Sequence, residues 1–139
     1  MLELALNDSS TGIYQKDIAQ SQDISNKYLD HIIVELKTAG LIKNVGGKKS
    51  GYRLTRPAQE ITMLDIYNAF EPGFHINDCA YSDSDCPRLR ICAVKGFWSG
   101  LNSLMNDYFR SVTLEDIRTN QITIEGLKSD ESCPFHDED

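Results

Sequence analysis

The chain has 139 residues, a formal net charge of −7 and a hydrophobic content of 40%. This length allows one hydrophobic core but not two full domains. No apolar run reaches the length of a membrane span, and the apolar start is too short for a signal peptide, so we expect a cytoplasmic protein that is not bound to a membrane. Phosphate-loop, nucleophile-elbow and paired-acid motifs are missing from the sequence, and we therefore do not expect an enzyme.

Charge is unevenly distributed along the chain. Residues 1–57 contain eight Lys and Arg against six Asp and Glu, whereas residues 58–139 contain six against fifteen. Residues 43–56 include five basic residues and no acidic one. Because phosphates respond to the local charge of a surface, the acidic total does not exclude a nucleic-acid partner. A solvated hairpin is the alternative interpretation of this basic run.

The first half of the chain predicts a helix-turn-helix. Residues 1–6 form a helix fragment that looks like the end of a longer helix, and residues 15–22 form a short helix. After a turn, a second helix runs to about Ala39 with Ser25 as its N-cap, and Gly40 supplies a left-handed cap at its end. This helix carries an apolar stripe at helical spacing, formed by Leu29, Ile32, Ile33 and Leu36.

A β-hairpin follows, with strands over 41–45 and 52–55 and a tip rich in Gly and Lys. In a helix-turn-helix, the residues at the start of the second helix face base edges in the major groove. Lysine and tyrosine can reach phosphates or bases there, and aspartate can accept a hydrogen bond from a cytosine amino group. An ordinary pair of antiparallel helices with a polar surface is the alternative. The candidate DNA contacts on this helix are Ser25, Asn26, Lys27, Tyr28 and Asp30.

The second half of the chain predicts three helices around a turn-rich loop. A helix over about 63–70 precedes the loop, a long helix over 94–112 follows it, and Thr113 caps a short last helix over 114–118. The long helix has an aromatic-rich face that the small domain beside it cannot cover. We therefore expect it to pair with the same helix of a second copy, the alternative being that it packs within one chain.

Three of the four cysteines lie in the loop, Cys79, Cys86 and Cys92, with the spacing C-x6-C-x5-C. Three soft thiolates and one further ligand suffice for an iron–sulfur cluster. Zinc bound by the three cysteines and a histidine, such as His75 or His136, is a second interpretation, although structural zinc sites usually have closer cysteine pairs. Free thiols or a disulfide switch are the third. The spacing alone does not distinguish these three.

The segment KDIAQSQDISNKYLDHIIVELKTAGLIKNVGGKKSGYRLTRPAQEITMLDIYNAFE, residues 16–71, closely resembles the Rrf2 family of winged-helix regulators, of the IscR, NsrR and CymR type. The resemblance continues through CAVKGFW and TLEDI and covers about residues 1–118. It implies a homodimeric transcription factor, usually a repressor, that binds a palindromic operator in double-stranded DNA. Members with three cysteines in this loop bind an iron–sulfur cluster and sense nitric oxide, iron or redox state. By position, the resemblance assigns the cluster ligands to Cys79, Cys86 and Cys92, and DNA contacts in the wing to Lys48, Lys49, Ser50 and Tyr52.

The sequence departs from the family pattern at three places. The family begins with a longer helix, which in the NsrR type supplies a carboxylate ligand from the partner subunit, so we expect a truncated start. In the IscR type a histidine three residues after the third cysteine completes the site, whereas Lys95 stands there and disfavours that ligation. A 4Fe–4S cluster is therefore favoured over 2Fe–2S. In the wing, Gly46 replaces an arginine, and Lys48 and Lys49 are expected to take over its contacts.

The expected fold is mainly α with a small β-hairpin, a winged helix-turn-helix joined to a long dimerisation helix. The expected function is a transcriptional regulator, controlled by the cluster. One alternative is a cluster-free regulator of the CymR type, which acts through a partner protein or a thiol switch. Another is a zinc-stabilised interaction module without DNA binding. The expected regions are a DNA-binding domain over 1–72, a sensor loop over 73–93, a dimerisation helix and C-terminal helix over 94–128, and a disordered acidic tail over 129–139.

Overall fold

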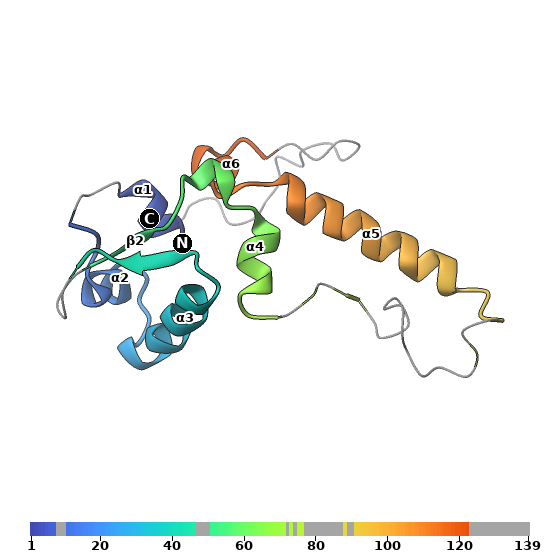
Figure 1. Ribbon diagram of the computed structural model, residues 1–139, viewed down its shortest axis with the longest axis horizontal. Coiled ribbons are helices and arrows are strands. Elements are labelled where there is room, and N and C mark those ends of the chain that lie inside the picture. Colours follow the sequence, from blue (N-terminus) through green and yellow to red (C-terminus); the bar gives the residue numbers. More distant parts are fainter. Residues whose placement is uncertain are drawn as a thin grey trace, which may run out of the picture.

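The computed structural model describes residues 1–7, 11–46, 51–71, 73, 75–76, 88 and 91–122. Residues 47–50 of the predicted wing tip, two of the three loop cysteines and the acidic tail lie outside these residues. The mainly helical winged-helix fold with one small sheet is confirmed (Figure 1). The elements in chain order are α1 Leu2–Leu6, α2 Gln15–Ser21, α3 Asn26–Thr38, β1 Ile42–Asn44, β2 Tyr52–Leu54, the 3-10 helix η1 Ala58–Glu60, α4 Met63–Asn68, α5 Lys95–Ser111 and α6 Leu114–Thr119.

The core lies between α3, the hairpin and the elements that surround them. The predicted stripe of α3 faces it, with Leu29, Ile33 and Leu36 buried. Leu41, just after α3, is 1% exposed, and Ile61, just before α4, is 0% exposed. Each such side chain contributes about 1.5–3 kcal/mol by leaving water. Burial in this half of the molecule therefore holds α3 in place for its exposed face to act.

Local hydrogen bonds set the ends of the helices. The predicted N-cap is present, because the Ser25 hydroxyl accepts a hydrogen bond from the Tyr28 amide at 3.1 Å. Gly40 has a φ of +71°, as expected for a residue that ends a helix in the left-handed region. Thr113 caps α6 as predicted, with Asp116 completing a capping box. A second capping box, formed by Thr62 and Asp65 at the start of α4, was not predicted.

The hairpin is antiparallel, and the segment before α2 pairs with its second strand. Ile42 pairs with Leu54 and Asn44 with Tyr52. Tyr52 also exchanges two backbone hydrogen bonds with Ile13, of 2.8 and 3.0 Å. This pairing brings Gly51 against Gly12, so closely that a Cβ on Gly51 would lie 2.5 Å from the carbonyl carbon of Gly12. Because the two backbones cross here so closely, only glycine fits at positions 12 and 51.

The second half of the chain leaves the core and returns to it at one place. An isolated antiparallel bridge joins Thr62 to Thr113, with the Met63 amide donating to Val112 O and the Leu114 amide donating to Ile61 O, both at 2.8 Å. Between these points α5 projects away from the rest of the molecule, with α4 against the half of α5 nearer the core (Figure 1). Helix α6 then packs on α1 and η1. Among the described residues, no helix is long and apolar enough to cross a bilayer.

We expect Gly51→Ala to lower the free energy of unfolding by about 1–3 kcal/mol or more, because the added methyl group overlaps the backbone of residues 12 and 13. Gly96→Ala is the matched control, since a Cβ at Gly96, which lies in helix α5, meets nothing within 4 Å. Alanine also has the higher helix propensity, so this control should keep or slightly raise stability. Urea unfolding at one fixed protein concentration measures both. Equal stability of the two variants would contradict the close approach of the Gly12 and Gly51 backbones.

Candidate nucleic-acid interface and sensor segment

The first turn of α3 presents the predicted DNA contacts at the surface. Asn26, Lys27 and Tyr28 are exposed, and the Tyr28 side chain retains 59% of its accessible area. Ser25 is also exposed, but its hydroxyl oxygen is occupied as the helix cap. These residues therefore form a continuous polar and aromatic surface on a helix whose opposite side is fixed in the core.

A glutamine at the start of α2 is bound to this surface. The Gln15 side-chain amide donates to Asp30 Oδ1 at 2.6 Å and lies 3.3 Å from the carbonyl oxygen of Asn26. The contact links the beginning of α2 to the first turn of α3, and it engages one carboxylate oxygen of Asp30. Asp30 is among the predicted base contacts, whereas Gln15 was not predicted to take part. The available signal was a polar residue at the first position of α2.

Two further residues share the outer face of α3 with Lys27. His31 and Val34 follow it at i+4 and i+7, and both are exposed. Val34 retains 57% of its accessible area although it is aliphatic. Apolar side chains in the major groove contact the methyl group of thymine, so an exposed valine fits a base-reading face. His31 and Val34 were not among the predicted contacts, but the helical period that predicted the buried stripe also places them opposite to it.

The hairpin carries two exposed charged side chains and one tyrosine that packs against the core. Lys43 and Arg53 pair across the two strands and are both exposed. Tyr52 is half-buried, packs against the core and is attached through its backbone to Ile13. The predicted contacts Lys48, Lys49 and Ser50 lie outside the described residues. Lys43 and Arg53 therefore form an exposed basic pair on the described part of the hairpin.

The cysteine segment, residues 73–93, is hydrogen-bonded to α5 at both of its described ends. At its beginning, the Ile76 amide donates to the side-chain oxygen of Asn102 at 3.2 Å. At its end, Cys92 is half-buried and its carbonyl oxygen accepts from the Lys95 amide at 3.3 Å, in the first turn of α5. Cys79 and Cys86 lie outside the described residues. Within the described part of the chain, no three His, Cys, Asp or Glu side chains converge as metal ligands do.

Part of the apolar face of helix α5 is exposed. None of its seventeen residues is buried, and Phe97 and Leu104 are 64% and 67% exposed. Helix α4 covers only part of it, through an edge-to-face contact of Tyr67 with Phe109 at 5.8 Å between ring centroids. Large apolar patches of this kind on a protein surface mark interaction sites.

Comparison with known proteins places this arrangement in a family. The Rrf2 family, described as "Iron-dependent Transcriptional regulator", matches residues 1–120. A Neisseria meningitidis protein named as an HTH-type transcriptional regulator is 34% identical over 117 residues, which cover 84% of this chain and 78% of that protein. The structure of CymR, the global cysteine regulator of B. subtilis, superposes with a TM-score of 0.68 at 26% identity, covering 86% of this chain and 87% of CymR. T. potens IscR gives a TM-score of 0.66 at 26% identity, with coverages of 87% and 79%.

These similarities extend over the helix-turn-helix, the hairpin and α5 alike, and the described helices and strands occur in the order that the resemblance predicts. The family consists of transcriptional regulators rather than enzymes, in agreement with the absence of catalytic motifs from the sequence. The chain belongs to the Rrf2 family of DNA-binding transcriptional regulators.

Proposed function

We propose that this regulator is a homodimer whose affinity for a palindromic operator depends on an iron–sulfur cluster bound by Cys79, Cys86 and Cys92. The observation that carries the proposal is the position of the cysteine segment. It connects α4, which adjoins the DNA-binding half, to α5, and both its described ends are bonded to α5. A change in the shape of this segment would therefore act directly on the joint between the two halves.

The donor set fits an iron–sulfur group. Three thiolates are the ligands that such clusters take, and a fourth ligand of a different kind leaves one iron reactive. Lys95 stands where the IscR type has a histidine, so a 4Fe–4S cluster remains favoured over 2Fe–2S. When bound, the cluster would supply a centre sensitive to nitric oxide, iron supply or redox state. The cysteines and the chain between them would hold it beside α5.

The second copy is the occupant that we propose for the apolar face of α5. Burial of several large side chains there would contribute about 1.5–3 kcal/mol each, which the single chain forgoes. A twofold pairing of α5 brings the same patch of both copies together and sets the distance between the two α3 helices. Two reading helices about one DNA turn apart match a palindromic operator.

A cluster-free regulator is the second candidate. Its support is the similarity to CymR, the global cysteine regulator of B. subtilis. In that case the cysteines would act as a thiol switch, or a partner protein would carry the signal. A zinc-stabilised interaction module is less well supported, because the chain belongs to a family of DNA-binding regulators.

We expect Tyr28→Ala to weaken binding to the DNA of the protein's own promoter by roughly 5- to 150-fold, the equivalent of about 1–3 kcal/mol for one lost contact. The iron content and melting temperature should stay unchanged, because the Tyr28 side chain is 59% exposed. Thr38→Ala, at the opposite end of the same helix and also exposed, is the control and should bind normally. Gel-shift titrations measure both. Normal binding by Tyr28→Ala would contradict the proposed contact of Tyr28 with DNA.

Cys86→Ala should abolish the iron, the sulfide and the visible absorbance of anaerobically purified protein while the fold persists. Cys133→Ala is the control, because this cysteine lies in the acidic tail and is not a proposed ligand. Iron and sulfide analysis with circular dichroism checks this outcome. A colourless, iron-free wild-type protein would favour the cluster-free regulator, and stoichiometric zinc would favour the interaction module.

We expect Leu104→Glu to convert the dimer into a monomer, because it places a charge on the exposed apolar face of α5. Ser103→Glu adds the same charge to an adjacent exposed residue that points to a different side of the helix, and it should leave the dimer intact. Sedimentation velocity measures both. A dimer in the leucine variant would place the interface elsewhere.

A further inference from the structure

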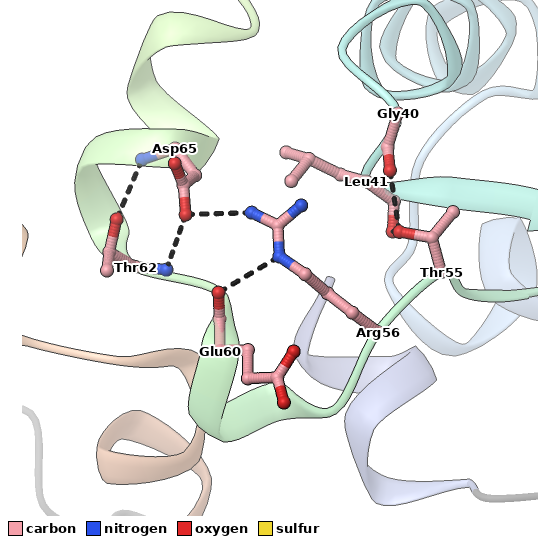
Figure 2. Close-up of polar contacts among 7 residues, drawn as sticks. All are labelled: Gly40, Leu41, Thr55, Arg56, Glu60, Thr62 and Asp65. Carbon is pink, nitrogen blue, oxygen red and sulfur yellow. Dashed lines mark hydrogen bonds and ion pairs between the residues drawn. The ribbon is translucent and has the colours of Figure 1, made fainter.

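Arg56 joins the end of the hairpin to the start of α4 (Figure 2). Its Nε donates to the carbonyl oxygen of Glu60 at 2.9 Å, and its Nη2 donates to Asp65 Oδ2, also at 2.9 Å. Asp65 Oδ2 also accepts from the Thr62 amide at 3.0 Å, within the capping box of α4. A guanidinium held at two of its nitrogens has a fixed orientation, which a single contact would not give.

The preceding residue makes the corresponding contacts on the other side. The Thr55 hydroxyl donates to Gly40 O at 2.6 Å and lies 3.2 Å from Leu41 O, and its amide donates to Leu41 O at 3.1 Å. Gly40 and Leu41 are the residues that end α3 and lead into β1. Figure 2 shows that the two sets of contacts lie next to each other. The dipeptide Thr55–Arg56 thus bonds to the end of α3 through one residue and to the beginning of α4 through the next.

The far end of α4 leads to the cysteine segment. Tyr67 of α4 contacts Phe109 of α5, and the segment with the three cysteines begins a few residues later. Helix α4 therefore stands between that segment and the DNA-reading half. Its first turn is the part that Arg56 holds.

The contact between Arg56 and Asp65 is accessible to water rather than buried in the core. The side chains are 34% and 39% exposed. Partial burial opposes ionisation of Asp65, but the hydrogen bonds from Thr62 and Arg56 outweigh it and lower the pKa of this carboxyl group. The pair is therefore charged at neutral pH and is lost only as the pH falls through that lowered pKa. Ion pairs this exposed contribute little to global stability, so the contact directs α4 more than it stabilises the fold.

We propose that Arg56 is a positioning residue that, through Asp65, fixes the orientation of α4 and α5 relative to α3. The coupling of this orientation to the cysteine segment rests on the proposed function, whereas the orientation itself does not. The backbone bridge of Thr62 to Thr113 and the buried Ile61 still attach α4 when Arg56 is removed. Loss of Arg56 then frees the direction of the helix without unfolding it.

The direct test is a distance measurement in the full chain. Spin labels are attached through unnatural amino acids at Lys37 in α3 and Ser103 in α5, both exposed, and the labelled chain is diluted with excess unlabelled chain. Double electron–electron resonance should give a narrow intrachain distance distribution for the wild type and a broadened or shifted one for Arg56→Gln. Arg118→Gln removes the exposed pair with Glu115 on α6 and should match the wild type. An unchanged distribution for Arg56→Gln overturns the proposal.

Three more variants distinguish a loss of the Arg56 contact from a general loss of folding. Arg56→Lys keeps the charge but cannot donate from two nitrogens, so it should be intermediate in width. Asp65→Asn should broaden the distribution as Arg56→Gln does. Asp116→Asn alters the equivalent capping box of α6, in which Asp116 Oδ2 accepts hydrogen bonds from Thr113 and not from an arginine, and it should leave the distribution unchanged. Broadening by the Asp116 variant as well would assign the effect to helix capping and refute the role of Arg56.

The regulatory consequence is measured separately, as the ratio of promoter affinities with and without the cluster. For Arg56→Gln this ratio should fall to about one, with an unfolding midpoint close to that of the wild type. A variant that keeps the wild-type ratio refutes the coupling. If the wild type itself has a ratio of one, the sensing function fails, while the distance measurement still decides the role of Arg56.

Discussion

The backbone bridge between Thr62 and Thr113 is the constraint on which this architecture depends. It brings the beginning of α4 and the beginning of α6 to one place, beside a side chain that is completely buried, that of Ile61. Helix α4 remains against the core through Ile66, whereas α5 projects away from it (Figure 1). Because the bridge fixes both ends of this part of the chain, changes in α5 need not disturb the packing around α3.

The two halves of the molecule differ in how their apolar residues are satisfied. Around α3 and the hairpin they are buried within the chain, whereas α5 has no buried residue. The core around α3 and the hairpin, which includes Leu114 of α6, is thus buried within one chain, whereas the apolar face of α5 is not. In the homodimer that we propose, the DNA-reading surface stays folded while its position relative to the second copy can change. The small polar joint at Arg56 lies at the boundary between the halves.

Features with a local cause were predictable from the sequence. The stripe of α3, the Ser25 cap and the left-handed Gly40 each depend on residues a few positions apart, and the structure confirms them. The capping box at Thr62 has the same Thr-x-x-Asp spacing as the one predicted at Thr113, so this signal was present and overlooked. The family resemblance contributed the winged-helix assignment that periodicity alone left open.

Contacts between distant segments were not predictable in the same way. Gln15 with Asp30, and Arg56 with Asp65, are polar residues whose partners follow from how the helices and hairpin pack, and nothing in the spacing of a single chain specifies them. The approach of Gly12 to Gly51 likewise arises only when residues 12–13 pair with the hairpin. For the candidate site, the sequence therefore gave the exposed start of α3 but not the contacts that orient it.

The contact of Gly12 with Gly51 also has a consequence for how relatives can diverge. Two glycines and one backbone pairing hold the loop end of the hairpin, where β2 begins, next to the residues for which the sequence predicts DNA contact. In the DNA complex that we propose, substitutions in the predicted tip could change operator preference during evolution without a compensating substitution at this pairing.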